Sequence, residues 1–302
     1  MDLSSPPGWQ FWIDRGGTFT DVVAHSPAGE LIALKLLSEG PAHYADAGIE
    51  GIRRILRQRS AGMRPTIDSI RMGTTLATNA LLERRGEPTG LVITQGFGEA
   101  LRIGYQNRPQ LFARHIRLPE LLYSSVIEAR ERIDAYGAIL VPLDEADLRA
   151  RLQEMRSGRF RSVAIVFMHG YRFSVHEKRA AAIAQELGFE QISVSHEVAP
   201  LLRLITRGDT TVVDGYLSPL LARYVEELRA EIRRDLGEPR LYFMQSNGGL
   251  ADARAFRGIN SILSGPAGGL VGMVKAGTAA GYRQLIGFDM GGTSTDVSLY
   301  DG

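Results

Sequence analysis

Two short segments of the chain repeat the same run of acidic, glycine and hydroxyl residues. Residues 13–21 and 288–296 share an Asp, a Gly-Gly pair, two threonines and a closing Asp at matching positions. Apolar residues flank each run, which predicts a β-hairpin with the glycines at its tip. Because Gly-Gly allows positive φ and carries no side chain, backbone N–H groups at such a tip can approach phosphate oxygens. Two tips that face each other would hold the phosphates of one nucleotide, so the repeat points to ATP.

The residues of these runs that could bind a nucleotide are acids, glycines and threonines. They are Asp14, Gly16, Gly17, Thr18 and Thr20 in the first run, and Asp289, Gly291, Gly292, Thr293 and Thr295 in the second. Hydroxyl groups donate hydrogen bonds to phosphate oxygens. A carboxylate repels phosphate, so Asp14 and Asp289 are predicted to bind Mg²⁺ through its waters. A tight turn opened by an Asp would account for a single copy, whereas the repeat favours phosphate binding.

Other nucleotide motifs and several other classes of protein do not fit this sequence. It has no Gly-Lys-Ser/Thr of a P-loop and no Gly-x-Gly-x-x-Gly of a dinucleotide site. Its 302 residues are 44% hydrophobic and 23% charged, the net charge is +1, and cysteine is absent. These values predict a globular protein of about two domains, without disulfides and without a general attraction to nucleic acid. No segment reads as a signal peptide or a membrane span, so we expect a cytoplasmic protein that does not bind membranes.

The hydrophobic pattern alternates between strands and helices, which is typical of an α/β fold. Strands are predicted at residues 9–14, 20–25, 30–37, 69–72, 90–94, 126–134, 163–168, 192–196, 241–245 and 285–289. Helices are predicted around residues 49–56, 76–84, 144–155, 176–187 and 270–280, and within 211–236. Residues 96–124 lack a clear period and are expected to be irregular, and residues 264–269 are expected to form a Gly/Pro turn.

The two Asp-x-Gly-Gly-Thr hairpins, with a helix leading into the second, resemble the actin-like ATPase superfamily. Within it, the chain resembles the hydantoinase A/5-oxoprolinase family, through residues 13–21, 73–84, 244–250, 264–269 and 289–296. Further segments resemble the 5-oxoprolinase branch in particular, namely residues 35–39, 44–46, 51–56, 103–109 and 207–214.

This resemblance implies a fold, a division into domains and partners. The fold is an actin-like ATPase (ribonuclease H-like) lobe with an inserted α/β subdomain, followed by the start of a second, truncated lobe. The N-terminal domain of the family is expected at residues 9–205 and the beginning of the next at 206–302. Family members continue further, so we expect a fragment, and its stand-alone activity is left open. A hydantoinase B-like part or subunit is the implied partner, and a homo-oligomer is left open.

The resemblance further implies ATP-driven hydrolysis of a cyclic amide, converting 5-oxoproline to glutamate with release of ADP and phosphate. Two alternatives stay open. One is the ATP-binding subunit of a related hydantoinase or ketone carboxylase. The other is a nucleotide-binding scaffold without turnover, which such folds permit.

Four residues are candidates for a part in the reaction. Asp21 and Asp296 either orient a nucleophile or only fix the hairpin turns. Thr75 and Asn79 belong to a polar cluster, with Thr74 and Thr78, at a predicted strand-to-helix junction. That junction either binds a substrate carboxylate or phosphate at the helix N-terminus, or contains only a capping hydroxyl.

Some weaker candidates lie outside the two runs. Arg102, Arg108 and Arg207 could each bind a carboxylate through a bidentate pair. Residues 245–248 follow a predicted strand, where ligand sites of α/β proteins collect. His169 and His176 show no metal-binding spacing, so we expect each to be structural or exposed and not a metal ligand.

Overall fold

The computed structural model describes residues 8–39, 44–59, 65–106, 112–116, 118–291 and 295–302. The chain divides into two compact units. Unit 1 comprises Met1–Glu83 and Leu221–Gly302, and unit 2 comprises Arg84–Leu220. Unit 2 is thus inserted, in sequence, between the two parts of unit 1.

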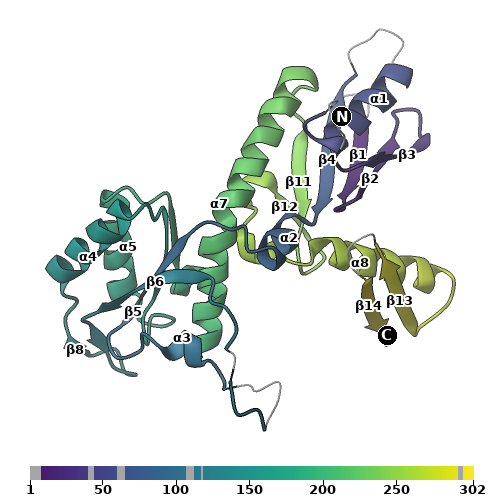
Figure 1. The fold of residues 1–302 in the computed structure, drawn as a ribbon. Helices are drawn as coiled ribbons and strands as arrows, with labels where there is room; N and C mark the ends of the chain where they lie inside the picture. The colour runs from purple at the N-terminus through teal and green to yellow at the C-terminus, as the bar shows by residue number, and fades with distance from the viewer. Residues whose placement is uncertain (1–7, 40–43, 60–64, 107–111, 117, 292–294) are drawn as a thin grey trace, which may run out of the picture. The chain divides into compact units, whose positions relative to one another are not determined.

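Unit 1 contains a six-stranded mixed sheet with the order β12-β11-β4-β1-β2-β3 (Figure 1). Its strands are β1 (Trp9–Arg15), β2 (Phe19–His25), β3 (Leu31–Leu37), β4 (Ile67–Thr74), β11 (Arg240–Met244) and β12 (Leu250–Asp252). The first three form an antiparallel meander, whereas β4 runs parallel to β1 and β11 parallel to β4. The predicted strands at residues 9–14, 20–25 and 30–37 are confirmed.

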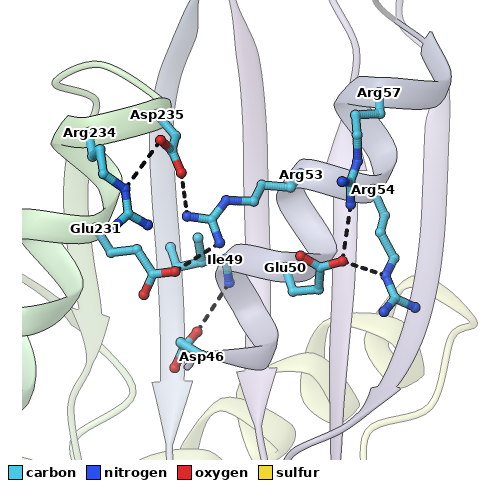
Figure 2. A network of polar contacts seen from close by, with 9 residues as sticks. All are labelled: Asp46, Ile49, Glu50, Arg53, Arg54, Arg57, Glu231, Arg234 and Asp235. Atoms are coloured by element: carbon cyan, nitrogen blue, oxygen red, sulfur yellow. Dashed lines mark hydrogen bonds and ion pairs between the residues drawn. The ribbon is translucent and has the colours of Figure 1, made fainter. Parts of the chain in front are cut away.

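Two helices cover one face of this sheet, α1 (Ala47–Arg59) and the last part of α7 (Leu204–Asp235). Phe11 of β1 packs there with Ile52 and Leu228, all of them buried. Figure 2 shows Arg53 of α1 between two acids of α7, donating to Glu231 at 2.8 Å and to Asp235 at 2.5 Å. The apolar packing supplies most of the attraction, and the ion pairs, which lie near the surface, set the register of the two helices.

The rest of unit 1 consists of α2 (Leu76–Leu82), two 3-10 helices, η1 (Ala253–Ala255) and η2 (Gly258–Asn260), α8 (Ser264–Ala279), and a separate hairpin of β13 (Leu285–Met290) and β14 (Thr295–Tyr300). The expected turn at residues 264–269 is wrong, because α8 already begins at Ser264. Pro266 lies in the first turn of the helix, where its missing N–H leaves no hydrogen bond unmade.

Unit 2 is built on a four-stranded, all-parallel sheet with the order β10-β9-β5-β6. Its strands are β5 (Thr89–Thr94), β6 (Tyr123–Ala129), β9 (Ser162–Val166) and β10 (Gln191–Val194), and β7 (Arg132–Ile133) pairs with β8 (Ile139–Val141) alongside. Helices α4 (Glu145–Ser157) and α5 (Val175–Glu186) pack on one face. The short α3 (Ala100–Ile103) and the first part of α7 pack on the other, and α6 (Ser195–Val198) follows β10. Both faces are therefore buried, as a parallel sheet requires.

Several boundaries differ from the predicted ones. The strand predicted at residues 126–134 is divided between β6 and β7, and the helix predicted within 211–236 begins earlier, at Leu204. Pro219 lies inside that helix. In the described part of the chain, no helix combines the length and the apolar character needed to span a bilayer.

Candidate functional site

The first hairpin forms as predicted. Its glycines do not adopt positive φ, and Gly16 is required because a side chain there would collide with the backbone. Asp14 pairs with Asp21 and Arg15 with Thr20 in the β1–β2 register. The Gly16 N–H donates to the Phe19 carbonyl oxygen at 3.0 Å. A Cβ at Gly16 would lie 2.9 Å from that same oxygen. Neither Gly16 nor Gly17 has positive φ, so the expected use of that conformation is wrong and close packing explains Gly16.

The threonines of this hairpin have different environments. Thr18 is exposed at the tip, whereas Thr20 is fully buried and its hydroxyl lies 2.9 Å from the Ser38 hydroxyl. Ser38 in turn donates from Oγ to the Gly16 carbonyl at 2.6 Å and from its N–H to the Thr18 carbonyl at 2.9 Å. Thr20 thus supports the tip from behind, and contact with a phosphate would require this hydrogen bond to break. Ser38 was not predicted, because only the β2–β3 pairing brings it to the hairpin.

Asp14 and Asp21 both face a pocket of about 340 Å³ in unit 1. Its lining includes Trp12, Asp14, Asp21, Arg71, Met244 and Gly265. Most of the other lining residues are apolar or glycine, so the few charged groups are surrounded by surface that does not hydrogen-bond to them. The size suits a small molecule or part of a nucleotide.

Asp21 has a cationic partner across the sheet. The Lys35 ammonium lies 2.7 Å from Asp21 Oδ1 and 2.5 Å from Oδ2, and β2–β3 pairing sets the two residues opposite each other. Both side chains are about half exposed, so the pair adds little to the stability of the chain. Its effect is to fix the direction of the Asp21 carboxylate at the edge of the pocket.

The first turns of α8 lie beside both repeated acids. A Cβ on Gly265 would be 3.9 Å from Asp14 Oδ1, and a Cβ on Gly269 would be 3.7 Å from Asp289 Oδ2. From β4, a Cβ on Gly73 would be 3.2 Å from the same Asp14 oxygen. These glycines therefore allow the backbone of α8 and β4 to lie close to the two carboxylates. The positive end of the α8 dipole lies on this side and favours negative charge there.

The pKa of Asp14 is raised above its ordinary value. Burial is the main cause, the neighbouring charges of Asp21 and Asp289 add to it, and Lys35 opposes it. Asp14 and Asp289 are thus close enough for their charges to interact, although they come from hairpins far apart in the sequence. A divalent cation between such acids would relieve the repulsion and favour their ionised forms.

This donor set fits a magnesium ion that keeps most of its waters. Within the described residues, no group of three or more His, Cys, Asp or Glu side chains could hold a metal. Magnesium is commonly bound through one or two carboxylates together with the phosphates of a substrate. Asp14 and Asp289 could supply the two carboxylates of such a site, and a fully protein-coordinated site is not needed.

The second hairpin repeats the register of the first. Asp289 pairs with Asp296 and Met290 with Thr295. Asp289, Gly291 and Thr295 are exposed. The two remaining candidates, Gly292 and Thr293, lie outside the described residues.

The polar cluster at residues 74–79 connects β4, α2 and the first hairpin. Thr75 donates from its backbone N–H (3.3 Å) and its hydroxyl (3.4 Å) to the Arg15 carbonyl, and Asn79 Nδ2 donates to Thr75 Oγ1 at 3.4 Å. The capping bond comes from Thr74, whose Oγ1 accepts from the Leu76 N–H at 3.2 Å. Thr78 Oγ1 accepts from the Leu263 N–H at 3.0 Å, next to the start of α8. The cluster fixes the backbone directly behind Asp14.

The sheet of unit 2 has an edge of the kind that binds ligands in other α/β proteins, but here buried side chains of unit 2 occupy it. The sheet order reverses between β5 and β9, the place where open α/β sheets commonly bind ligands. Arg207 lies beyond the carboxyl ends of β9 and β10, fully buried, and donates to the Phe167 carbonyl at 2.6 Å and to Ser195 Oγ at 2.9 Å. Its other donors bond to the carbonyls of Met168, Leu201 and Leu202. Arg207 is therefore structural, and the prediction that it could bind a substrate carboxylate is wrong.

The other weak candidates also have partners of their own. Arg102 pairs with Glu99 at 3.2 Å, and Arg108 lies outside the described residues. His176 lies 2.8 Å from the Glu131 carboxylate in the core, which confirms its structural role. Residues 245–248 form the turn between β11 and β12, closed by the Gly248 N–H donating to the Gln245 carbonyl at 2.9 Å.

Comparison with known proteins relates the whole chain to one family. Residues 10–188 match the description "Hydantoinase/oxoprolinase N-terminal region", and residues 207–302 match "Hydantoinase/oxoprolinase". The 5-oxoprolinase of Dictyostelium discoideum is 40% identical over 97% of this chain, but only 27% of that protein is covered.

Two solved structures share the mixed α/β fold. The ATP-dependent caprolactamase of Pseudomonas jessenii matches with a TM-score of 0.82 and 32% identity, over 96% of this chain and 43% of that one. A nucleotide-free acetone carboxylase matches with a TM-score of 0.81 over the same shares of the two chains. Its 23% identity supports the fold alone. The chain thus spans less than half the length of each of these proteins.

Proposed function

Because the chain belongs to the hydantoinase/oxoprolinase family, we propose that it is the nucleotide-binding part of an ATP-dependent enzyme that hydrolyses the cyclic amide 5-oxoproline. The products would be glutamate, ADP and phosphate, with two waters consumed. The observation that carries the proposal is the pair Asp14 and Asp289, which α8 brings into electrostatic contact beside a glycine-rich hairpin and a pocket. The lobe around them would be of the actin-like ATPase type.

The chemistry follows from the stability of the amide. Resonance makes a five-membered lactam carbonyl a poor electrophile, and water attacks it slowly. Bound ATP with Mg²⁺ would supply a phosphoryl group to the carbonyl oxygen, which makes the carbon electrophilic and provides a leaving group. Catalysis of this kind depends on positioning and on neutralising charge.

We assign the residues of this chain as follows. The backbone at Gly16 and Gly17, with Thr18, would bind phosphate oxygens, as would Gly291, Gly292, Thr293 and Thr295 at the second tip. Asp14 and Asp289 would hold Mg²⁺ through its waters. Asp21 and Asp296 would either orient a nucleophile or fix the turns, and Thr75 and Asn79 would position the backbone behind Asp14. Thr20 would support the tip.

The relatives named above support a second candidate function, the hydrolysis of another cyclic amide. The caprolactamase, at 32% identity, acts on a lactam with a larger ring, so this chain could equally belong to an enzyme for another cyclic amide. The ATP-binding subunit of a hydantoinase or ketone carboxylase and a scaffold without turnover are further alternatives. A hydantoinase B-like partner, a cytoplasmic location and a homo-oligomer complete the proposal.

The test is substrate-stimulated ADP release by this chain assembled with a second lobe and a hydantoinase B-like part. We expect 5-oxoproline to stimulate release, while hydantoin does not. Asp14→Ala and Asp289→Ala should each lower the stimulated rate by about 100-fold or more. Glu186→Ala, which removes an exposed acid of unit 2, is the control and should keep the rate.

Either of two results would overturn this proposal. An ATP hydrolysis rate that 5-oxoproline does not change would refute the substrate assignment, and the chain would then belong to an ATPase that acts on another substrate. Full activity in Asp14→Ala would remove the assignment of the site.

A further inference from the structure

Arg71 is the cation in the wall of the pocket lined by Asp14 and Asp21, here named the Asp14 pocket. Arg71 lies on β4 directly opposite Trp12 of β1, and both residues line the pocket. The guanidinium carbon is 4.9 Å from the centre of the Trp12 ring, and Nη1 donates to Gln10 Oε1 at 3.2 Å. In the part of the chain that the structure describes, no carboxylate lies within ion-pair distance of Arg71.

The cations of the neighbouring strands β3 and β1 differ from Arg71 in that respect. Lys35 pairs with Asp21 at 2.5 Å, and Arg15 lies 3.4 Å from Asp46. An arginine has five N–H donors, and Arg71 uses one of them on a neutral amide. Contact with the Trp12 ring fixes the plane of the guanidinium while leaving its edge free for further hydrogen bonds. This geometry suits a carboxylate bound by two parallel hydrogen bonds.

The pocket wall combines acidic, basic and apolar surface. Asp14 and Asp21 supply the acidic part, and Arg71 supplies the basic part. Trp12, Val23 and Met72 provide apolar surface in the same lining. A ligand that matches this distribution has a compact apolar body, one anionic group for Arg71, and a polar group to meet the Asp14 side.

We propose that the Asp14 pocket binds a small cyclic amide that carries one carboxylate, and that Arg71 pairs with this carboxylate. The inference rests on the proposed function, since it places the substrate beside the acids assigned to the nucleotide site. In 5-oxoproline the ring N–H lies between the carbonyl carbon and the carbon that carries the carboxylate. One molecule can therefore present its carboxylate to Arg71 and its N–H to the Asp14 carboxylate, with the carbonyl beside it and the ring against Trp12. Arg71 is thus a specificity-determining residue for acidic lactams.

The test compares two lactams that differ only in the carboxylate. In the assembled enzyme, KM is measured for 5-oxoproline, for 2-pyrrolidinone and for ATP in the wild type, Arg71→Gln and Arg71→Lys. Arg71→Gln should raise KM for 5-oxoproline by about 10- to 100-fold, the usual effect of losing a charged hydrogen-bond partner. KM for 2-pyrrolidinone and for ATP should stay within about twofold, and Arg71→Lys should recover part of the loss. Arg240→Gln is the matched control, because this β11 arginine lies outside the pocket lining.

The outcomes separate this inference from the proposed function. An unchanged KM for 5-oxoproline in Arg71→Gln, or an equal rise for both lactams, would overturn the role of Arg71. A rise in KM for ATP alone would assign Arg71 to the nucleotide and also overturn it. Direct binding of 5-oxoproline, measured by titration calorimetry, does not need turnover. Binding that Arg71→Gln abolishes would support the inference even if ATP hydrolysis ignored 5-oxoproline, whereas no binding by the wild type would overturn it.

Discussion

The two hairpins of unit 1 share a sequence pattern and a register but differ in their surroundings. In the first, Ile13 and Val22 pair with each other and are 3% and 0% exposed. Their counterparts in the second, Phe288 and Val297, also pair with each other but are 68% and 67% exposed. The pattern of Asp, glycine and threonine therefore specifies the hairpin and its pairing, while burial depends on the elements that neighbour it.

The two hairpins are alike on the face that carries the chemistry. Asp14 and Asp289 both lie on the side of their hairpin that faces α8, near Gly265 and Gly269. In each hairpin the other side carries the apolar pair, which is covered by α1 and α7 in the first copy. The repeat thus conserves the polar face, and each of the following changes tests how far the likeness between the two copies extends.

The largest effect on stability is expected from removing the matching apolar side chains. Ile13→Ala leaves a cavity in the core of unit 1 and should lower the free energy of unfolding by about 2–5 kcal/mol. Phe288→Ala removes a side chain that makes little contact and should change it by less than about 0.5 kcal/mol. Urea unfolding of the chain, followed by circular dichroism, measures both. Equal losses in the two variants would show that the second hairpin is packed as well as the first.

A smaller difference is expected at the matching threonines. Thr20 is buried and bonded to Ser38, whereas Thr295 is exposed. Thr20→Val leaves the Ser38 hydroxyl without this partner and should cost about 1 kcal/mol. Thr295→Val should be nearly neutral for stability. If Thr20→Val left both stability and ADP release unchanged, the support that we assign to this hydroxyl would be absent.

The family and the first hairpin could be predicted from the sequence, because both depend on short runs of residues whose chemistry is local. The family assignment is confirmed, and residues 13–21 form the expected hairpin. Arg71 could not be predicted, since its position results from the pairing of β4 with a strand that is distant in sequence. Ser38 could not be predicted, since its contacts with the hairpin tip depend on the exact register of β3 on β2. The prediction that Arg207 binds a substrate was wrong because nothing in its local sequence shows the backbone carbonyls that surround it in the fold.

A further prediction concerns the pH dependence that burial gives to Asp14. Its folded-state pKa is raised above the ordinary value of 3.8. The folded chain therefore holds this proton more tightly than the unfolded chain does, and stability is lost as pH rises through the folded pKa. Asp14→Asn removes that loss, so its Tm should exceed the wild-type Tm at pH 7 and the difference should shrink towards pH 3.

Asp252 provides a control of opposite sign. Hydrogen bonds from Arg254 lower its pKa to about 2. Its contribution to stability is present above pH 3.8 and is lost as pH falls towards 2. Asp252→Asn should therefore lower the Tm at pH 7, with the difference vanishing near pH 2. If Asp14→Asn followed the same trend as Asp252→Asn, the desolvation and repulsion assigned to Asp14 would be refuted.

The smallest effect should come from the contact between the hairpins themselves. Asp289 is one of the charges that raise the Asp14 pKa, after burial and Asp21. Asp289→Asn should lower the Asp14 pKa without returning it to its ordinary value, because the two larger causes remain. Carboxyl-carbon NMR titration of Asp14 measures this shift, and Asp301→Asn, at the far end of the second hairpin, is the control. Added Mg²⁺ should lower the Asp14 pKa in the wild type. The effect should be smaller in Asp289→Asn, because the ion then has only one of its two carboxylate ligands and binds more weakly. An Asp14 pKa that responds to neither Asp289→Asn nor Mg²⁺ would mean that the two copies of the motif do not form one site.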